Sequence, residues 1–584
     1  EQVNKTLVLE PTSTAWMYYS PVEPADGFSQ LGKGFGNMLD VMEKYQLEYD
    51  LGCENIIKDH GEIDNKNFVI GHRAYDLVVL PESLKNLDQP TFDLLKQYMA
   101  NGGKVLLLGE PPQYIDGKKT NDFDELISKH EKGWKQADAV TDPEALDLLS
   151  SENFSVDQPQ NIRGKVFFFF FQVEDGQIIF WSNFNQEADA SISFATKGKA
   201  VSKLNAFTGN IEPYTYTQLK ENQVKVQFNL EPAGSLLLFI HQDKADAVSG
   251  NVQRAVNIEE INTSATDIKR IAPNTLTLDY LDLQVKGRQF EDIYFTAAAD
   301  SAYKSHGLEE YGRGGYNPWS AAVQYKTNVL DMGEQFGENS GFTATYIFET
   351  TGGFVPESLK AVVEWPHLYT VQINGNTIQP QKGAWWLDRS FGVFEIGEFL
   401  QAGRNELTLR IQPMHIHAEI QPVYLVGDFG LTSQEHGFRL SQPQDLDIGP
   451  WKAQQAPFYS YTVAYSKTFK ADDNKHYKVR LNDWNGTVTR IKVNGEHAGI
   501  IGWKPYEMDI TQWLDEGENE VTVEVVGSLK NLLGPHHGNI TEGLVSPWSF
   551  FSAPEHQPAG NRYDLHEYGL FEDFEVVRYE STTN

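Results

Sequence analysis

The sequence has almost no cysteine, no long apolar run and no excess of basic residues. Cys53 is the one cysteine among 584 residues, which excludes an intrachain disulfide and a cysteine-cluster metal site. The longest apolar run, Val166–Phe171, has the length of a strand and falls far short of the roughly 18 residues of a membrane span. We therefore expect no membrane span.

The charge balance argues against two classes of partner. Lys and Arg total 48 against 81 Asp and Glu, a formal net charge of −33. Because affinity for a phosphate backbone comes largely from Lys and Arg, we expect no nucleic acid partner, and an anionic membrane surface is equally disfavoured. The hydrophobic share of 40% is ordinary for a globular protein, and the length corresponds to about four domains. Neutral ligands such as sugars are compatible with this composition without being indicated by it.

Residues 1–138 have the pattern of an α/β domain. Short apolar runs at Thr6–Leu9, Tyr75–Leu80 and Lys104–Leu108 alternate with helical patterns at Phe28–Tyr45 and Phe92–Met99. Strands that are apolar throughout are buried on both faces, and strands separated by helices pair in parallel. The sequence therefore predicts a parallel sheet covered by helices.

From residue 139 onward the pattern becomes antiparallel. Val166–Phe171 and Gln177–Trp181 flank an Asp-Gly turn, which predicts a hairpin. We interpret 139–246 as a small antiparallel β domain, and the polar, acidic segment 246–272 as a linker.

The remaining sequence contains an internal repeat. Val371–Gly375 and Ile491–Gly495 both end in Asn-Gly, and each is followed by a Gly-x-Asn motif that leads into an alternating strand. Asn-Gly suits a tight hairpin turn because both residues tolerate positive φ. We expect two β-sandwiches of jelly-roll type, at 273–431 and 432–584.

Carboxylates follow the predicted parallel strands, and ligands of such sheets bind beyond the carboxyl ends of the strands. Glu10, Asp50, Glu82 and Glu110 stand at these ends. Glycoside hydrolysis needs two carboxyl groups on either side of the scissile bond, so Glu10 and Glu110 are weak catalytic candidates. The alternative is that these carboxylates simply meet solvent where the strands end.

Metal ligation stays open from the sequence. Met414-His-Ile-His417 places two histidines on one face of a strand, and His536-His537 follows Pro535, but neither pair has a third ligand at a recognisable spacing. Acid-rich loops of sandwiches can assemble oxygen ligands from distant segments. A structural calcium ion is therefore an open alternative.

Aromatic residues are abundant, with 12 Trp, 26 Tyr and 34 Phe. Many lie in expected loops, including Trp365 and the pair Trp385-Trp386. Flat indoles match the apolar C–H faces of sugar rings, while nearby polar groups bond the hydroxyls. The alternative is core packing under loops. The residues that we single out for carbohydrate binding are Trp484, Trp503, Tyr506, His536 and Trp548.

The closing segments resemble the galactose-binding-like domains of large glycoside hydrolases. The residues that carry this resemblance are Ile491–Gly495, Gly502–Tyr506, Asp509–Thr511, Gly517–Asn519 and Gly527–His536. Upstream, Pro422–Phe429 looks like a strand that precedes such a domain. Asn205–Gly209 with Pro232–Ser235 looks like the small β domain of the same enzymes. The opening segment is similar to a flavodoxin- or amidotransferase-like domain.

In this order, the chain resembles the C-terminal half of a glycoside hydrolase family 106 protein, one of the α-L-rhamnosidases of gut-type Bacteroidetes. The resemblance implies that the catalytic carboxylates and a calcium ion belong to an N-terminal (β/α)₈ barrel, and that the protein is periplasmic, cell-surface or secreted. A barrel needs about 250 residues, and the α/β segment has room for only about four or five strand–helix units. We expect the catalytic barrel of the same protein to lie outside this chain, and we expect oligo- or polysaccharide as a partner.

Three hypotheses follow. The first is a non-catalytic, carbohydrate-associated accessory region of a glycoside hydrolase that acts on plant or microbial polysaccharide. The second is a complete glycoside hydrolase that uses carboxylates at the sheet edge of the first domain. The third is a free-standing carbohydrate-binding protein.

Overall fold

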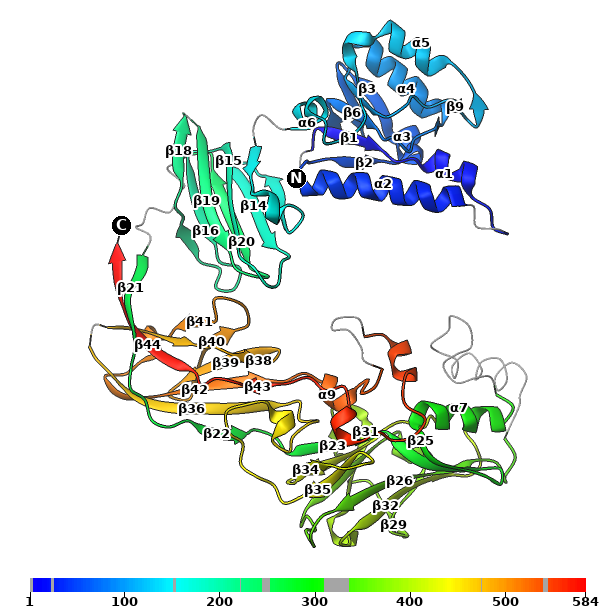
Figure 1. The fold of residues 1–584 in the computed structure, drawn as a ribbon, viewed down its shortest axis with the longest axis vertical. Helices are drawn as coiled ribbons and strands as arrows, with labels where there is room; N and C mark the ends of the chain where they lie inside the picture. Colours follow the sequence, from blue (N-terminus) through cyan, green and yellow to red (C-terminus); the bar gives the residue numbers. More distant parts are fainter. Residues whose placement is uncertain are drawn as a thin grey trace. The chain divides into compact units, whose positions relative to one another are not determined.

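The computed structural model describes residues 4–22, 26–150, 154–220, 222–243, 253–308, 336–473, 475–538 and 545–583. The chain forms two compact units. The first contains residues 1–254, 503–505 and 582–584, and the second contains 255–502 and 506–581. The protein is multidomain and mainly β, with an α/β domain at its beginning (Figure 1). Within the described ranges, no helix is long and apolar enough to cross a membrane.

The α/β domain contains an open, five-stranded parallel sheet. The sheet order is β2-β1-β6-β8-β11, and all four pairings are parallel. Numbered along the chain this is order 2-1-3-4-5, the flavodoxin-like arrangement. The predicted parallel sheet is thus confirmed. The strands are β1 (Thr6–Leu9), β2 (Asp50–Gly52), β6 (Leu77–Leu80), β8 (Val105–Leu108) and β11 (Trp134–Ala137).

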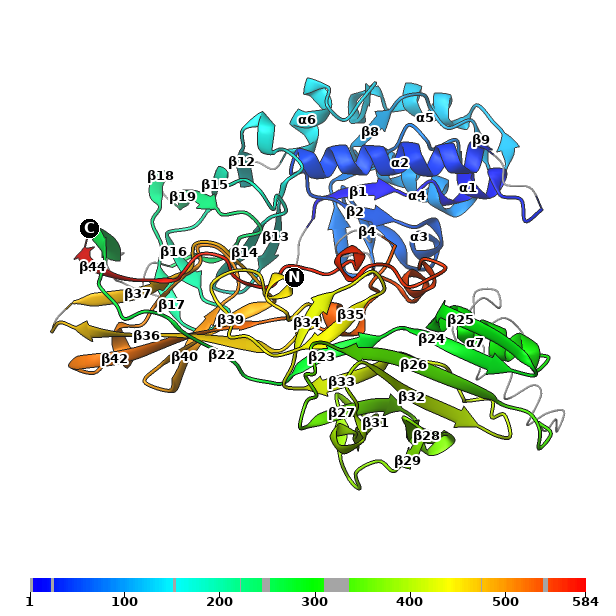
Figure 2. The same ribbon diagram turned by 60° about the horizontal axis from the view of Figure 1, so that its bottom comes forward.

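Helices cover both faces of this sheet. Val8 points into a core with residues of α2 and α6, whereas Leu7 and Leu9 point into a core with residues of α3, α4 and α5. Figure 2 shows α2 on one side of the sheet and α3 on the other. The helices are α1 (Thr12–Tyr18), α2 (Asp26–Lys44), α3 (Glu54–His60), α4 (Gln89–Ala100), α5 (Asp122–Lys129) and α6 (Pro143–Leu149). Two small three-stranded sheets are added. One is antiparallel and contains β3 (Gly61–Asp64), β4 (Asn67–Ile70) and β5 (Arg73–Tyr75); the other is mixed and contains β7 (Asn86–Leu87), β9 (Tyr114–Ile115) and β10 (Lys118–Lys119).

The small β domain is a sandwich of two sheets, ordered β12-β15-β19-β18 and β13-β14-β20-β16-β17. The hairpin β13–β14 confirms the predicted Asp-Gly connection. Trp181 and Phe194 are buried in the core between the sheets. The strands are β12 (Phe154–Asp157), β13 (Val166–Gln172), β14 (Gly176–Asn183), β15 (Ala190–Lys197), β16 (Ala200–Leu204), β17 (Ile211–Pro213), β18 (Thr217–Lys220), β19 (Gln223–Leu230) and β20 (Ser235–His241).

The second unit contains two sandwiches, and the smaller sheet of the first sandwich has the order β23-β33-β27-β31-β30. Its strands are β23 (Asn274–Leu278), β27 (Leu359–Glu364), β30 (Trp385–Trp386), β31 (Asp388–Glu395) and β33 (Val423–Gly427). The facing sheet contains β24 (Tyr280–Val285), β25 (Arg288–Tyr294), β26 (Phe342–Thr350), β28 (Thr370–Ile373), β29 (Asn376–Ile378), β32 (Arg404–Ile411), β34 (Gly430–Ser433) and β35 (Phe438–Ser441). Helix α7 (Phe295–Ser305) buries Ala298, Ala302 and Tyr303 in the same core.

The closing sandwich packs two sheets around Trp451, Tyr465 and Phe574. One sheet contains β21 (Gln253–Glu260), β37 (His476–Arg480), β41 (Glu507–Asp509) and β44 (Glu575–Thr583). The other contains β22 (Asp267–Arg270), β36 (Thr462–Ala471), β39 (Val488–Val493), β40 (Glu496–Ile501) and β42 (Gly517–Val526). A two-stranded pair joins β38 (Trp484–Asn485) to β43 (Gly569–Leu570).

The interpretation of 246–272 as a linker is wrong over its described part. Strand β21 joins the sheet of β44, and β22 pairs with β36 from Asp267 opposite Ser466 to Arg270 opposite Val463. The polar composition of this segment reflects two edge strands, because each has a paired strand on one side only. The closing sandwich therefore begins before the first one in the chain.

The repeated Asn-Gly motifs occupy equivalent hairpins. Asn374 and Gly375 connect β28 to β29 with φ of 48° and 82°, and Asn494 and Gly495 connect β39 to β40 with φ of 50° and 82°. Positive φ at both central residues is the signature of a type I′ turn. The turn predicted from the sequence is thus present in both copies.

Candidate functional site

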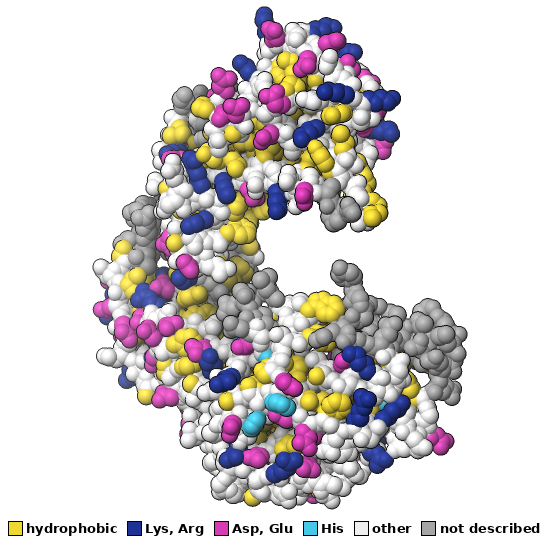
Figure 3. Space-filling view, turned by 45° about the vertical axis from the view of Figure 1, so that its right-hand side comes forward, with side chains coloured by type: hydrophobic (Ala, Val, Ile, Leu, Met, Phe, Trp, Pro, Cys, Tyr) yellow, Lys and Arg dark blue, Asp and Glu magenta, His cyan; other side chains and the backbone are white. Residues whose placement is uncertain are grey.

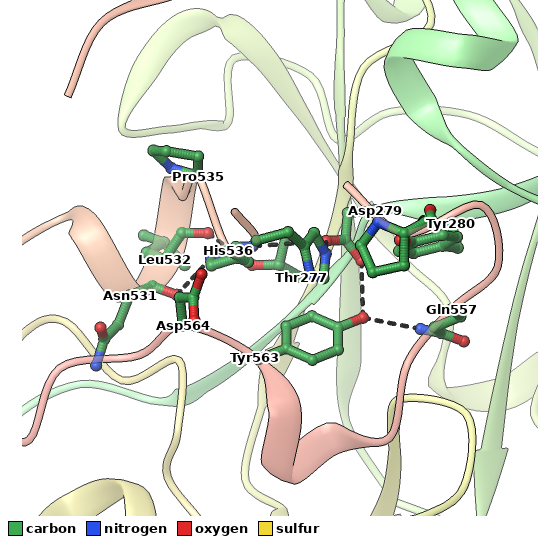
Figure 4. Close-up of polar contacts among 12 residues, drawn as sticks. Thr277, Asp279, Tyr280, Asn531, Leu532, Pro535, His536, Gln557, Tyr563 and Asp564 are labelled. Carbon is green, nitrogen blue, oxygen red and sulfur yellow. Dashed lines mark hydrogen bonds and ion pairs between the residues drawn. The ribbon is translucent and has the colours of Figure 1, made fainter. Parts of the chain in front are cut away.

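A cluster of buried polar side chains lies where the two sandwiches of the second unit meet. Asp279, between β23 and β24, is 1% exposed. His537 Nε2 lies 2.9 Å from Asp279 Oδ2, and the Tyr563 hydroxyl donates to Asp279 Oδ1 at 3.0 Å. Gln557 in turn donates to the Tyr563 hydroxyl at 3.1 Å. Figure 4 shows Asp279 and Tyr563 joined in this way, with His536 beside them.

The cluster holds Asp279 ionised. His536 Nε2 donates to the carbonyl of Asn531 at 2.9 Å, while its Nδ1 faces Asp279 Oδ2 at 3.6 Å. Burial alone would raise the pKa of Asp279, but the contacts with His536 and His537 outweigh it and lower that pKa to about 2. Burial beside this carboxylate raises the pKa of Tyr563 well above its ordinary value.

These contacts fasten the loop after β42 to the first sandwich. Thr277 Oγ1 donates to the Leu532 carbonyl at 2.6 Å, and Leu532 packs with Val362 and Tyr424. Lys530, in the short helix α9 (Lys530–Leu533), donates to the carbonyls of Pro535 and Asp564 at 2.5 and 3.0 Å. Because the network is deeply buried, we interpret it as structural: it holds this loop against the first sandwich. His536, which we predicted to contact carbohydrate, lies inside it at 2% exposure.

The other predicted aromatics lie nearer the surface. Trp484 is half-buried, with its ring 5.4 Å from that of Tyr506 at an interplanar angle of 76°. Trp503 is 44% exposed and Trp548 is 46% exposed. The structure therefore brings Trp484 and Tyr506 together.

Two exposed indoles outside our predicted set belong to the first sandwich of the second unit. Trp385 is 56% exposed and Trp365 is 50% exposed. Trp365 also has a left-handed backbone, with φ of 47°, which is unusual for a bulky side chain and marks backbone strain. The tandem Trp385-Trp386 was the sequence signal for this surface. Hydrophobic periodicity does not distinguish exposed aromatic residues such as these from aromatic residues of the core.

Glu10, Glu82 and Glu110 follow β1, β6 and β8 and lie at the carboxyl edge of the sheet, as expected. The prediction is wrong for Asp50, which begins β2 opposite Leu7 and therefore lies toward the amino ends of the strands. Glu10 is half-buried and its backbone N–H donates to the Gly52 carbonyl at 3.0 Å, while Glu110 is exposed. A crevice of about 670 Å³ opens at this edge beside α2, and its acidic lining residues are Glu82 and Asp138. Glu10 and Glu110 are not among the residues that line it.

The histidines of the first sandwich lie side by side, with the rings of His415 and His417 5.4 Å apart. Within the part of the chain that the structure describes, no group of three or more His, Cys, Asp or Glu side chains is placed to hold a metal ion. Acidic and basic side chains are interspersed on the surface shown in Figure 3.

No protein-family model and no curated protein matches this chain. Among solved structures, the rhamnosidase from Novosphingobium sp. PP1Y aligns with 13% identity and a TM-score of 0.46 over 91% of this chain and 36% of its own. An exo-carrageenase, GH42, from Bacteroides ovatus aligns with 15% identity and a TM-score of 0.25 over 41% of this chain and 29% of its own. The GH42 β-galactosidase Gan42B from G. stearothermophilus, as a catalytic mutant, aligns with 11% identity and a TM-score of 0.22 over 41% of each chain. These neighbours are glycoside hydrolases, and the chain spans about a third of the length of the rhamnosidase.

Proposed function

We propose that this chain is a non-catalytic, carbohydrate-associated accessory region of a glycoside hydrolase that resembles family 106 α-L-rhamnosidases. It serves the degradation of plant or microbial polysaccharide, in the periplasm or at the cell surface. The catalytic barrel of this proposal is a separate part of the same protein. The motifs from Ile491–Gly495 to Gly527–His536 support the family part of the proposal.

The observation that carries the proposal is the exposure of indole rings in the second unit. Trp365, Trp385 and Trp548 remain 50%, 56% and 46% exposed. Because a Trp side chain buries about 150–250 Å² when it packs, leaving several half-exposed forgoes a large gain. Sugar rings offer apolar faces that would cover such indoles on binding.

Binding of the whole chain to saccharides tests this function. We expect the protein to be retarded in native gels that contain soluble plant or microbial polysaccharide, and to show a change in Trp fluorescence on titration with oligosaccharide. Unchanged mobility and fluorescence across a broad panel of neutral and acidic polysaccharides would contradict the proposal.

A complete glycoside hydrolase is the second candidate, and the crevice at the carboxyl edge of the parallel sheet favours it. Glu82 and Asp138 are two carboxylates in its lining, and glycoside hydrolysis uses two carboxyl groups. Turnover of an aryl α-L-rhamnoside by this chain, abolished by Glu82→Gln or by Glu10→Gln and Glu110→Gln, would favour this candidate over the accessory role.

A further inference from the structure

A groove of about 870 Å³ crosses the outer face of the sheet β23-β33-β27-β31-β30. This sheet packs its inner face, with Ala361 and Phe394, into the sandwich core. Its side chains alternate, so the neighbouring positions Val362 and Val393 project to the opposite face. Val362 lies directly opposite Val393 in register, and both line the groove.

The floor of the groove is apolar and rigid. Val362, Val393 and Val426 lie on three adjacent strands and are 1%, 6% and 7% exposed. Trp386 packs over the same face, with its ring 5.1 Å from that of Tyr424. Leu532, from the loop fastened by the Asp279 cluster, covers another part of this face. The floor is therefore held by a packed sheet, which leaves it little freedom to lose on binding.

The walls of the groove carry aromatic rings. Trp385 and Tyr461 line it together with Trp386. Burial raises the pKa of Tyr461, and the nearby Trp386 side chain offsets part of this rise. Trp385 is 56% exposed, and the register of β30 with β31 is irregular between Trp385 and Trp386. This irregularity sets the two indoles of a tandem pair in different environments.

Polar side chains line the groove beside these rings. Lys360 lies opposite Glu395 in register and pairs with it at 3.5 Å, and Gln381 donates to the same carboxylate at 3.0 Å. At another position in the lining, Asp428 pairs with Arg270 at 3.1 Å. Of the three charged residues in the lining, Lys360 and Asp428 have opposite partners, whereas Glu357 makes no ion pair with the residues that the structure describes. The groove therefore offers amides, a hydroxyl, two ion pairs and one carboxylate, and its lining cation is already paired.

Such a surface suits an uncharged polyhydroxylated ligand. Apolar floor and indole walls match the C–H faces of pyranose rings, and the amides of Gln381 and Gln442 can bond hydroxyls. A phosphorylated or strongly anionic ligand would need unpaired cations, whereas Lys360 and Arg270 are already paired. The volume lies toward the upper end of the range of about 300–1,000 Å³ for ligand pockets, which favours more than one sugar ring.

We propose that this groove is a binding site for a neutral oligosaccharide, with Trp385 as its stacking platform. The inference rests on the proposed carbohydrate-associated function and adds a place, a ligand class and a principal contact. Trp484, Trp503, Tyr506 and Trp548 are outside the groove, so the site differs from the residues that the sequence predicted.

The test compares the full chain with Trp385→Ala in titrations with short neutral oligosaccharides of the gluco, manno, galacto and rhamno series. We expect affinity to fall about tenfold or more in Trp385→Ala, because a central aromatic anchor carries a large share of binding energy. Trp385→Phe should recover part of it. Gln381→Ala should weaken binding less.

Trp16→Ala is the matched control. Trp16 is 68% exposed but belongs to α1 of the first unit, so removal of its indole should leave affinity unchanged. Melting temperatures of all variants should match that of the unmodified chain, since Trp385 lies at the surface. A Trp385→Ala variant that has lost its fold is replaced by Gln442→Ala, whose exposed side chain also lines the groove.

The outcomes separate the two proposals. Equal binding by the unmodified chain and by Trp385→Ala would refute the groove as the binding site. The proposed carbohydrate-associated function would still hold. Failure of the unmodified chain to bind any saccharide would overturn both. Binding of acidic oligosaccharides alone, lost at high salt, would overturn the assignment of a neutral ligand.

Discussion

Asn374 donates a hydrogen bond from Nδ2 to Oδ1 of Asn405 at 2.8 Å, and Asn494 donates in the same way to Asn519 at 2.9 Å. In each pair the first Asn also accepts a bond from a backbone N–H through Oδ1, from Glu406 in one case and from Glu520 in the other. In each sandwich, an Asn–Asn pair therefore joins one hairpin to one long strand. The internal repeat is therefore a repeat of polar contacts as well as of strand pattern.

We expect removal of either buried Asn to destabilise its own sandwich. Asn405 donates to the carbonyls of Gln401 and Gly403, and its Oδ1 accepts a bond from the Gln401 N–H. Asn405→Ala should therefore lower the free energy of unfolding by about 1–3 kcal/mol, because buried backbone groups lose their partners.

Urea denaturation of the full chain measures this loss, and Asn519→Ala should give a loss of similar size in the closing sandwich. Asn376→Ala is the control, since this exposed Asn makes only long contacts of 3.3 and 3.4 Å, and it should change stability by less than about 0.5 kcal/mol. Equal effects of Asn405→Ala and Asn376→Ala would refute the structural role of the pair.

Acid should destabilise the second unit through Asp279. The pKa of Asp279 is lowered from 3.8 to about 2, so the folded state holds the ionised form at pH values where the unfolded chain is protonated. The resulting stability is present above about pH 4 and is lost as the pH falls toward about 2. Melting temperature against pH should show this decline, and Asp279→Asn should flatten it.

Asp279→Asn should also cost about 1–3 kcal/mol at neutral pH, because one of the two oxygens that His537 and Tyr563 contact is replaced by an amide nitrogen. Tyr563→Phe removes one donor to the same carboxylate and should cost about 1–3 kcal/mol. Unchanged melting temperatures in both variants would show that the cluster does not stabilise the contact between the two sandwiches of the second unit.

Glu48 should give the α/β domain a pH dependence of opposite sign. Burial, with a smaller contribution from Asp50, raises the pKa of Glu48 from 4.5 to about 7. Between these two pH values the folded state keeps a proton that the unfolded chain has lost, so stability falls as the pH rises through this window. Glu48→Gln should remove this fall. Amide hydrogen exchange of the neighbouring strand β2, measured between pH 5 and pH 7 and corrected for intrinsic rates, distinguishes Glu48→Gln from the unmodified chain.

Glu54 should be a structural acid of the α/β domain. Its two carboxylate oxygens accept the backbone N–H groups of Ser13 at 3.0 Å and Asp88 at 2.6 Å. Glu54→Ala leaves both donors unpaired at a buried position and should lower the free energy of unfolding by about 1–3 kcal/mol. Glu54→Gln keeps one acceptor oxygen and should cost less. Similar losses in the two variants, measured in urea, would count against this role.

Much of the fold was predictable from local pattern. The run at Thr6–Leu9 is a buried parallel strand, and the amphipathic stretch Phe28–Tyr45 corresponds to α2 at Asp26–Lys44. The Asn-Gly turns were predicted because positive φ is a property of those two residues, independent of the rest of the chain. The segment 246–272 was misread because its two edge strands pair with partners far along the chain, β22 with β36 and β21 with β44.

The sequence by itself determined most strands, the hairpin turns and the repeat, because each shows in a pattern of neighbours within a few residues. The alternation of apolar strands with helices indicated the parallel sheet. Only the tertiary structure decided which polar and aromatic side chains are accessible. His536 is 2% exposed and Trp385 is 56% exposed, although both stand in loop-like or edge segments. Burial depends on which distant strands and loops pack against a residue, and no local pattern encodes that packing.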